Sequence, residues 1–572
     1  MRNSEVYSLF MEIADILDIM GENPFKSRAY RKAAQAIKHL GRDIAELDKE
    51  GALETIPGVG KELAKKTSEF LNTGRLRYYE KIKAKVPEGL LEVIKIQGIG
   101  PKTAKFLYEK AKVASIEDLE KALREGRLKG LPGLKQKSLE NIEKGLESYK
   151  KGRERLPLGV VWEEAQALVE KLKGMKGVTD ASAAGSFRRL RDTVKDLDLV
   201  AASKRPEEVI RAFKEMPEVK EVIASGETKA VLLLTSGLQV DLIVVPPESF
   251  GAALVHATGS WAHNLRVRSL ARELGFIANE YGIFEEKSGK RLGGNTEEEY
   301  YKLLNLPWIP PELRESGAEV DAALEGRLPR LIEPSDIKGD LHLHTKWSDG
   351  HNTIKEMAEA CLKLGYQYMA ITEHSKSLVV GNGLNEERLL KQIEEIRRVS
   401  EEVRGIKILT GIEMDILTDG SLDFSDDILA QLDFVIASIH SGFRLDKATQ
   451  TWRIIKAMQN PHVNLIGHIS GRLLGEREAY EVDYDEVFKV AKDTNTHIEI
   501  NAYPLRMDLF DIYCLRAKEL GAPLCITSDA HHYNDLGQIY FGVAVARRGW
   551  LTKEEVLNCL DLPDFLKAVR KR

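Results

Sequence analysis

The stretch IKGDLHLHT, at residues 337–345, has the character of a buried strand that ends in two histidines. Six further strand-like runs follow it, and helix-like stretches between them space the strands at roughly 30 residues. These runs occupy residues 366–375, 406–414, 433–440, 463–470, 497–502 and 523–532. Alternation of strand and helix at this period is typical of a parallel barrel. We therefore expect a distorted seven-stranded (β/α) barrel over residues 337–572.

Polar side chains suited to metal or phosphate contact end each of these runs. They are His342, His344, Glu373, His374, Glu413, His440, His468, Asn501, Asp529 and His531, with Asp349 on the loop after the first strand. The carboxyl ends of parallel barrel strands share one face, so these side chains should converge on one pocket. A lone histidine at a strand end is more often a packing residue, but that explanation does not cover the whole set. Arg472 and Arg506 follow strand ends as candidate phosphate clamps or surface residues.

The length of 572 residues indicates three or four domains, because one domain usually holds ~100–200 residues. A hydrophobic content of 43% and a charged content of 30% exclude collagen-like and wholly disordered chains. No apolar run approaches the ~18–20 residues of a membrane helix, and acidic residues interrupt the first twenty positions. We expect no membrane contact and a cytoplasmic location. The four cysteines form no CxxC pair, which predicts reduced thiols.

Residues 1–150 have helical periodicity with short glycine-containing turns. IPGVGKELAKK (56–66) and IQGIGPKTAKF (96–106) each place a tight turn before a lysine-rich helix, and LPGLKQKSLEN (131–141) is a degenerate copy with Lys135 replacing a glycine. Residues 1–160 carry 32 Lys and Arg against 24 Asp and Glu, whereas the whole chain has a net charge of −5. The segments resemble the helix-hairpin-helix motif, which grips nucleic-acid backbone. A plain turn between helices is the alternative for one copy.

We assign nucleic-acid binding to residues in and beside the first two of these turns. They are Gly58, Gly60, Lys66, Gly98, Gly100 and Lys102.

A mixed α/β pattern begins near residue 155, with strand-like runs at 196–203, 229–236 and 238–246. Asp196 and Asp198 are two residues apart and should project from one side of a strand, whereas Leu197 and Leu199 face the core. Such a pair attracts Mg²⁺, and Asp241 on another strand can supply a third carboxylate. An incidental pair on a solvated edge is the alternative. Gly185 and Ser186 form a turn upstream, and the guanidiniums of Arg188 and Arg189 suit a triphosphate. Residues 250–320 are expected to return to helix and turn.

Residues 1–320 resemble the family X DNA polymerases. The Gly-Ser turn, the paired aspartates, the distant strand aspartate and HATGSWAHNLRVRSLARELGFIANEYG (256–282) carry the resemblance. It implies a nucleotidyltransferase in which two Mg²⁺ ions on Asp196, Asp198 and Asp241 serve a primer 3′-hydroxyl and the leaving pyrophosphate. It places Gly185, Ser186 and Arg189 at the incoming triphosphate. It further places Thr258 and Gly259 beside the sugar, Asn264 toward the base edge and Arg268 toward the template.

Two positions depart from that family's pattern. His256 and Ala257 stand where vertebrate repair members have an aromatic pair, which predicts weakened rejection of ribonucleotides. Lys66 falls at the Schiff-base position of the family's deoxyribose-phosphate lyase domain, but Glu62 replaces a phosphate-binding lysine. Lyase activity is therefore a secondary hypothesis, and a phosphate contact or solvated charge is the alternative for Lys66.

Residues 337–572 resemble the PHP superfamily, named for polymerase and histidinol phosphatase. GDLHLHTKWSDG (339–350), ITEHS, GIEMDI, IASIHS, LIGHIS and TSDAHH carry the resemblance. It implies three ions, Mn²⁺ or Zn²⁺, that hydrolyse a phosphoester. It assigns His342, His344, Glu413 and Asp529 to one site, Glu413, His440 and His468 to a second, and Asp349, His374 and His531 to a third. His351, His462, His497 and His532 are left as structural.

The combined expectation is a multidomain α+β and α/β chain that fills short DNA gaps and trims 3′ ends. The expected parts are a lyase-like helical domain (1–80), helix-hairpin-helix fingers (81–150), palm (151–246), thumb (247–320), linker (321–336) and PHP domain (337–572). Expected partners are gapped or primer-template DNA and dNTPs, with the protein a monomer. PHP abasic-site endonuclease activity is a further expectation. A PHP phosphomonoesterase and a non-catalytic PHP scaffold in a DNA-end-binding protein are the alternatives.

Overall fold

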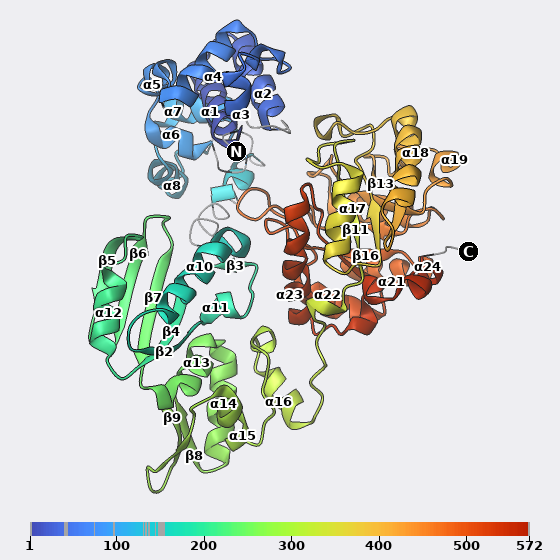
Figure 1. The fold of residues 1–572 in the computed structure, drawn as a ribbon. Coiled ribbons are helices and arrows are strands. Elements are labelled where there is room, and N and C mark those ends of the chain that lie inside the picture. Colours follow the sequence, from blue (N-terminus) through green and yellow to red (C-terminus); the bar gives the residue numbers. More distant parts are fainter. Residues whose placement is uncertain are drawn as a thin grey trace. The chain divides into compact units, whose positions relative to one another are not determined.

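The computed structural model describes residues 3–569 except 39–43, 74, 95, 97, 130, 132–133, 135–137, 144 and 147–154. The chain divides into two compact units, Met1–Arg153 and Glu154–Arg572, and each has its own apolar core (Figure 1). Lys135, at the centre of the degenerate third hairpin segment, lies outside the described residues. Among the described residues, no helix has the length and apolar character needed to cross a membrane.

The first unit is helical. Its described helices include α1 (Asn3–Met20), α2 (Pro24–Lys38), α3 (Ile44–Lys49), α4 (Lys61–Thr73), α5 (Arg77–Lys83), α6 (Glu88–Val93), α7 (Pro101–Ala111) and α8 (Ile116–Arg124). The buried positions of α1 recur at the spacing of one helix face, from Val6 through Phe10 and Ile13 to Leu17. This face packs on α2, so the core of the unit forms around the first two helices.

Two glycine turns in this unit have the same local geometry. Gly58 and Gly98 have φ angles of +85° and +92°, which side chains rarely adopt. Two residues later, the carbonyls of Gly60 and Gly100 accept the first helical hydrogen bonds of α4 and α7, both at 2.9 Å. The first N–H groups of each helix have no partner within the helix, so a phosphate bound at these turns stays a prediction.

A five-stranded sheet opens the second unit. Its order is β2 (Val178–Ala183), β4 (Leu197–Ser203), β7 (Gln239–Val245), β6 (Lys229–Leu234) and β5 (Val219–Ser225). Strands β4 and β7 are parallel, and the other neighbouring pairs are antiparallel. Helices α10 (Leu158–Lys173) and α12 (Pro206–Lys214) pack on the sheet, and α13 (Phe250–Thr258) packs on β4 from the face of Val200. Between β2 and β4, the chain forms α11 (Gly185–Arg188) and β3 (Thr193–Val194), which pairs with β1 (Leu156–Pro157).

Residues 250–320 contain more than helices and turns. The helices are α13, α14 (Trp261–Glu273), α15 (Glu297–Leu303) and α16 (Ala318–Leu324). A three-stranded antiparallel sheet of β8 (Phe276–Asn279), β9 (Gly282–Glu285) and β10 (Arg291–Gly293) lies between α14 and α15. The expectation of helix and turn alone was wrong here, because strands of only three or four residues carry too little alternation to be recognised.

The carboxy-terminal half of the unit is a seven-stranded parallel barrel. The strands pair in chain order: β11 (Gly339–Leu343), β12 (Tyr368–Ile371), β13 (Lys407–Asp415), β14 (Phe434–Ser438), β15 (Leu465–Ile466), β16 (His497–Asn501) and β17 (Leu524–Thr527). A parallel bridge between Leu343 and Ala530 nearly closes the barrel. This architecture confirms the fold that the strand period predicted.

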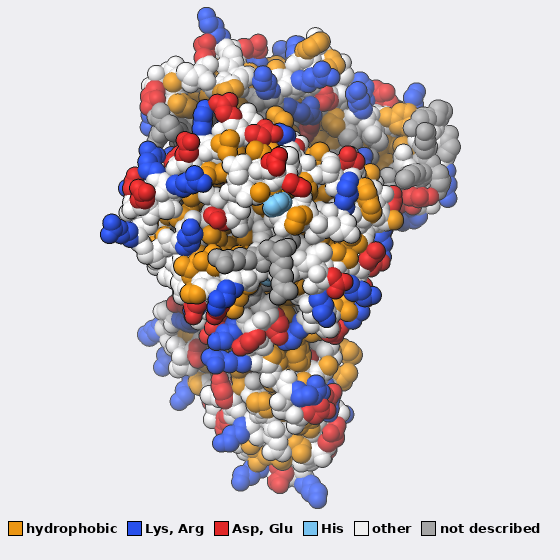
Figure 2. All heavy atoms as spheres, turned by 90° about the vertical axis from the view of Figure 1, so that its right-hand side faces the viewer, with side chains coloured by type: hydrophobic (Ala, Val, Ile, Leu, Met, Phe, Trp, Pro, Cys, Tyr) orange, Lys and Arg blue, Asp and Glu red, His pale blue; other side chains and the backbone are white. Residues whose placement is uncertain are grey.

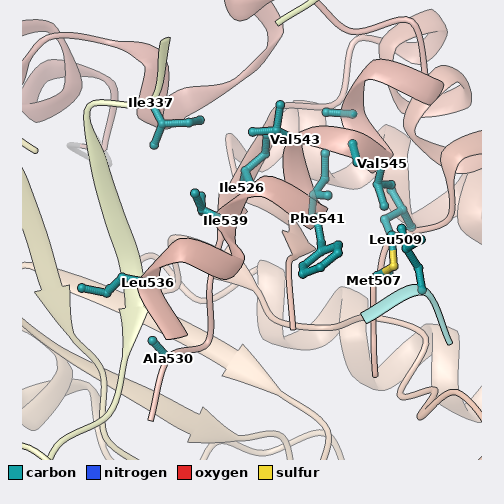
Figure 3. Packing of buried hydrophobic residues seen from close by; sticks show 14 of the residues in the cluster. Ile337, Met507, Leu509, Ile526, Ala530, Leu536, Ile539, Phe541, Val543 and Val545 are labelled. Carbon is teal, nitrogen blue, oxygen red and sulfur yellow. The ribbon is translucent and has the colours of Figure 1, made fainter. Parts of the chain in front are cut away.

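Helices surround the barrel and follow its strands in turn. They are α17 (Ile354–Lys363), α18 (Glu386–Glu402), α19 (Asp426–Leu429), α20 (Lys447–Met458), α21 (Tyr484–Thr494), α22 (Asp511–Leu520), α23 (Ile539–Arg548) and α24 (Leu562–Ala568). Ile526 on β17 packs with Ile539 and Val543 of α23 in the outer layer (Figure 3). Phe565 of α24 joins a separate cluster with Leu341, Tyr368 and Phe434, so one residue from each of several strands packs around it. Figure 2 shows basic and acidic side chains interspersed on one face of the protein.

Candidate active sites

Three carboxylates gather at the end of two neighbouring palm strands. Asp198 lies opposite Asp241 in the parallel register of β4 and β7, and Asp196 comes directly before β4. Leu197 and Leu199, which alternate with the two aspartates, are buried in the core. Burial, reinforced by the negative charges of Asp196 and Asp241, raises the pKa of Asp198 to about 7. Such mutual repulsion favours a bound divalent cation, so the donor set fits Mg²⁺.

The turn at Gly185 lies directly against this carboxylate group. A Cβ atom at Gly185 would come 1.9 Å from Oδ2 of Asp198, and the residue has a φ of +58°. Only glycine can occupy such a position. The backbone N–H of Ala184 donates to the carbonyl of Asp198 at 2.8 Å, which ties the turn to β4. A phosphate bound at this turn would therefore lie beside the carboxylates.

A cleft of about 490 Å³ opens between this turn and α14. Its lining includes all the residues expected at the nucleotide, namely Gly185, Ser186, Arg189, Thr258, Gly259, Asn264 and Arg268. The side-chain amide of Asn264 donates to the carbonyl of His256 at 2.8 Å, and Nη2 of Arg268 lies 3.0 Å from Nδ1 of the same histidine. His256 is therefore held in place by two of the residues expected to contact the base and the template.

Two apolar residues of the cleft were missed by sequence reasoning. Trp261 and Leu265 line it although their side chains are 79% and 55% exposed. They share one face of α14 with Asn264 and Arg268, because positions three and four apart on a helix are neighbours. That spacing is visible in the sequence and could have identified them.

Arg188 does not face the cleft, contrary to its expected role at the triphosphate. Its guanidinium binds both carboxylate oxygens of Glu297, at 2.7 and 2.8 Å, and Oγ1 of Thr258 at 2.8 Å. Arg314 pairs with the same carboxylate at 2.8 Å. Burial opposes ionisation of Glu297, yet Arg188 and Arg314 hold its pKa well below the usual range. Arg188 therefore connects palm and thumb.

The polar residues at the barrel strand ends converge on one buried group. Glu413 lies at the centre, with an oxygen 2.7 Å from Nδ1 of His374, 2.9 Å from Nε2 of His468 and 3.3 Å from Nε2 of His440. Its other neighbours are Nε2 of His342 at 3.4 Å and Nε2 of His344 at 3.7 Å.

Two acids surround this centre. Oδ1 of Asp529 lies 3.3 Å from Nε2 of His344, and Asp349 lies 3.4 Å from both His374 and His531. All nine residues expected as ligands thus lie in one cluster.

Three groups within the cluster could each hold one ion. They are His342, His344 and Asp529; His374, Glu413 and His440; and His344, Asp349, His374 and His531. His344 and His374 each take part in two groups, which differs from the division expected from the resemblance. His468 contacts Glu413 without belonging to any of the three groups.

Several buried atoms of the cluster make no hydrogen bond of acceptable geometry among the described residues, although some of them, such as Nδ1 of His374 and an oxygen of Glu413, lie close together. They are Nε2 of His342, Nδ1 and Nε2 of His344, Nδ1 of His374, Oε2 of Glu413 and Nδ1 of His468. Unpartnered buried polar atoms are costly, so the cluster fits metal ions, which would satisfy them. Further carboxylates orient the imidazoles: Glu499 lies 2.5 Å from Nδ1 of His342, and Asp415 lies 2.8 Å from Nδ1 of His440.

Not every polar strand end contributes to these groups. Glu373 is fully buried and accepts hydrogen bonds from the backbone of Thr345 at 3.0 Å and from Gln392 at 3.1 Å, and burial raises its pKa to about 7. Asn501 donates to Asp529 at 3.0 Å. Both residues support the loops and ligands around the cluster.

The two candidate phosphate clamps have different surroundings. Nε of Arg506 lies 3.7 Å from Asp529, and its Nη1 atom is buried without a partner among the described residues. Arg472 donates to the carbonyl of Arg506 at 2.6 Å and to Asp192 at 2.9 Å, and it lies 4.0 Å from the ring centroid of Phe510. Its partners engage the guanidinium of Arg472, so this arginine is neither free for a phosphate nor a surface residue.

Lys66 in the first unit lies in a polar and aromatic pocket. Its Nζ atom donates to the hydroxyl of Tyr30 at 2.6 Å and to Glu62 at 2.7 Å, and it lies 3.8 Å from the ring centroid of Tyr78. Its side chain is 14% exposed. Glu62, the residue that departs from the lyase pattern, is thus the partner of Lys66.

Known protein families match most of the chain. The matching families are a helix-hairpin-helix domain at residues 1–76, a SAM-like helix-hairpin-helix tandem at 90–147, the DNA polymerase beta thumb at 253–315 and the PHP domain at 340–503. Together with the two clusters, these matches define a DNA polymerase that carries a PHP domain.

Curated relatives support this class. The DNA polymerase/3′-5′ exonuclease PolX of Bacillus subtilis is 41% identical over 99% of this chain and 100% of its own length. A probable phosphatase of Thermoanaerobacter is 32% identical over 41% of this chain and 96% of its own length. Rat DNA polymerase lambda is 26% identical over 53% of this chain and 54% of its own length. The chain belongs to the family X DNA polymerases with a carboxy-terminal PHP domain.

Proposed function

We propose that this protein fills short gaps in DNA during base excision and end repair and removes 3′-terminal nucleotides at a separate centre. The family makes the chain a DNA polymerase with 3′–5′ exonuclease activity, a divalent-metal enzyme that uses DNA and dNTPs. The observation that carries the proposal is the presence of two separate clusters of potential metal ligands in one chain, carboxylates on the palm strands and imidazoles with carboxylates at the barrel mouth.

The palm cluster supports nucleotide addition. We assign Asp196, Asp198 and Asp241 to two Mg²⁺ ions, which supply activation of a hydroxyl nucleophile and charge stabilisation on phosphates. Gly185, Ser186 and Arg189 bind the triphosphate, since the turn offers backbone donors beside the carboxylates. Thr258, Gly259, Asn264 and Arg268 position the sugar and base from the opposite wall of the cleft.

The barrel cluster supports phosphodiester hydrolysis. We assign its nine candidate ligands to three ions, Mn²⁺ or Zn²⁺, which supply hydroxide near neutral pH. Arg506 is assigned to the phosphate of the 3′-terminal nucleotide, since its Nη1 atom is buried without a partner among the described residues and its Nε atom lies 3.7 Å from Asp529. Abasic-site endonuclease activity at the same centre is a further part of the proposal.

DNA is held by the helical unit. The glycine turns at Gly58–Gly60 and Gly98–Gly100 bind the phosphate backbone, and Lys102 and Lys66 add positive charge. Lys66 is the candidate nucleophile for lyase activity on an incised abasic site. Borohydride trapping of that substrate should yield an adduct with the wild-type protein that is absent from Lys66→Ala; no wild-type adduct would leave Lys66 as a phosphate contact.

The expected six-part division of the chain, including a linker at 321–336, is retained in the proposal. So are the monomeric state and the cytoplasmic location.

A labelled primer tests the division of labour. With a 5′-labelled gapped duplex, Asp198→Asn should abolish extension and leave Mn²⁺-dependent shortening, and His342→Ala should have the reverse effect. Loss of both activities from either substitution, in protein with unchanged circular dichroism, would contradict two separate centres.

The alternative of a PHP phosphomonoesterase is favoured by the probable phosphatase relative, which matches along almost its whole length. The same primer with an additional 3′-phosphate separates the alternatives. A ladder of shorter products supports an exonuclease, loss of the terminal phosphate alone supports a phosphatase, and an unchanged primer supports a non-catalytic scaffold.

A further inference from the structure

The second unit contains a contact between the palm and the barrel, and its apolar centre is Trp162 on α10. The indole stacks on Phe187 of α11 with 5.2 Å between ring centroids. Its centroid lies 5.1 and 5.4 Å from those of Tyr540 and Phe541 on α23. Phe541 belongs to the same buried cluster as Met507 and Leu509 of the segment after β16 (Figure 3). The helix that carries the triphosphate turn is thus packed on the barrel through one aromatic ring.

Charged residues continue this contact up to the nucleotide cleft. We call Arg189, Arg191, Glu315, Asp511 and Arg548 the Glu315 cluster. Glu315 accepts from Nε of Arg189 at 3.0 Å and from Nη1 of Arg548 at 2.8 Å. Arg548, the last residue of α23, also donates to the backbone carbonyl of Arg189 at 3.2 Å and pairs with Asp511. The barrel therefore contacts Arg189 both directly and through a shared carboxylate.

The balance of charge in the cluster determines how firmly Glu315 holds Arg189. Arg191 completes the cluster at 3.7 Å from Glu315 and 3.9 Å from Asp511. Three guanidiniums thus share two carboxylates. The side chains of Arg548 and Arg189 are only 4% and 14% exposed, so solvent screens their interactions weakly. If Arg548 were neutral, Glu315 would pair more strongly with Arg189.

A triphosphate must compete with Glu315 for the same guanidinium. Arg189 lines the nucleotide cleft, yet its Nε atom faces Glu315 and its Nη1 atom donates to the carbonyl of Thr258. We infer that Arg548 of the PHP domain is a positioning residue of the polymerase centre. Because Arg548 pairs with Glu315, Glu315 binds Arg189 less strongly, and Arg189 can bind the triphosphate of a dNTP. This inference rests on the proposed role of Arg189.

Steady-state gap filling tests the inference through the separate values of KM and kcat. Arg548→Met should raise KM for the dNTP roughly fivefold, which corresponds to about 1 kcal/mol, and change kcat by less than twofold. Affinity for gapped DNA and 3′–5′ degradation should also change by less than twofold. Arg548→Lys, which keeps the charge but not the planar fork, should give an intermediate KM.

A double substitution shows whether Arg548 acts through Glu315. In a Glu315→Gln background, Arg548→Met should leave KM for the dNTP unchanged, because the competing charge has been removed. A fivefold effect that persists in that background would contradict the shared-carboxylate route.

Asp192→Asn is the matched control for loosening of the palm–barrel contact. Asp192 pairs with Arg472 across the same contact, at 2.9 Å, and it lies near Arg191 and Arg548 but takes no part in the hydrogen bonds of Glu315 with Arg189 and Arg548. Its substitution should leave KM for the dNTP within twofold. An increase in KM equal to that of Arg548→Met would overturn the inference, since any weakening of the palm–barrel contact would then be enough to raise KM.

Arg189→Met separates failure of the inference from failure of the proposed function. It should raise KM for the dNTP more than Arg548→Met does. If only Arg189→Met has an effect, the role of Arg548 is refuted and the nucleotide site stands. If Arg189→Met has no effect on KM, both the role of Arg189 and the inference fail.

Discussion

Glu297 is a buried carboxylate that binds two guanidiniums and an indole. Arg188 comes from the palm, Arg314 from the thumb, and Nε1 of Trp308 donates at 2.9 Å. The pKa of Glu297 lies well below its ordinary value of 4.5, so the pairing stabilises the fold above pH 4.5 and is lost as pH falls through the lower, folded-state pKa.

Glu297→Gln should therefore lower the stability of the second unit at pH 7 by ~3–5 kcal/mol, because two buried guanidiniums lose their countercharge. The difference from wild type should shrink as pH is lowered below 4.5, since the carboxylate of the unfolded wild-type chain then takes up a proton, whereas the folded carboxylate stays ionised until its lower pKa is reached. Thermal unfolding at several pH values measures this. Glu298→Gln, on the exposed side of the same helix, should change stability by less than ~0.5 kcal/mol; equal losses for both variants would contradict the role of the pair.

His256 lines the cleft beside Ala257 and Thr258, where we propose that the sugar binds. We expect weak discrimination against ribonucleotides, because the aromatic pair of vertebrate family members is missing. His256→Tyr with Ala257→Phe should raise the ratio of kcat/KM for dCTP over CTP roughly tenfold, or about 1.4 kcal/mol. Single-nucleotide gap filling with each nucleotide gives this ratio, and a wild-type ratio that already equals that of an aromatic-gate enzyme would refute the expectation.

The glycine turns at Gly58 and Gly98 determine how two helices, α4 and α7, begin. Gly98 precedes α7 with a φ of +92°, and a Cβ there would lie 3.4 Å from the carbonyl oxygen of Asn141. Gly98→Ala should strain the turn by at least ~1 kcal/mol and weaken binding of a gapped duplex roughly fivefold. Fluorescence anisotropy measures this affinity. Gly51→Ala is the matched control, since Gly51 also has a positive φ of +67° but lies outside both hairpins with open space around it; an equal loss for both would contradict phosphate binding by the turn.

Elements with a strong local period could be predicted from the sequence. The seven barrel strands were all anticipated, because each is a run of apolar residues between helices, although β15 has only two residues where eight were expected. Strands β4, β6 and β7 of the palm sheet were found for the same reason, whereas β2 and β5 were not predicted. Strands β8 to β10 were missed because each has only three or four residues. The barrel topology was enough to predict that the nine residues converge. It could not show that His344 and His374 each belong to two groups, because this depends on the directions of their side chains, which the spacing of residues in the sequence does not determine.

Long-range partners could not be predicted at all. Arg472 was expected at a phosphate, but it pairs with Asp192, which is 280 positions away in the chain. Arg188 and Arg189 are adjacent in sequence, yet one binds Glu297 and the other Glu315. The partner of each arginine depends on how the domains pack together, and this cannot be predicted from a local sequence pattern.

At the scale of the whole molecule, the barrel cluster should connect metal binding with stability. Its ligands come from the ends of six strands, so bound ions would hold those strands together. Adding Mn²⁺ to chelator-treated protein at one hundred times its dissociation constant should stabilise the second unit by ~2.7 kcal/mol. Calorimetry should show a higher unfolding temperature for the wild type and none of this shift for Glu413→Gln. The exposed control Glu394→Gln should respond like the wild type, and a shift retained in Glu413→Gln would contradict the assignment of the central ligand.

The central claim is that one chain carries two separate metal centres, one for extending a DNA end and one for shortening it. Anomalous diffraction at the manganese edge, from crystals grown with Mn²⁺, gapped DNA and a non-hydrolysable dNTP, tests it most directly. The account predicts two peaks beside Asp196, Asp198 and Asp241 and three more around Glu413. An empty cluster at either place, in crystals whose other cluster is occupied, would contradict it.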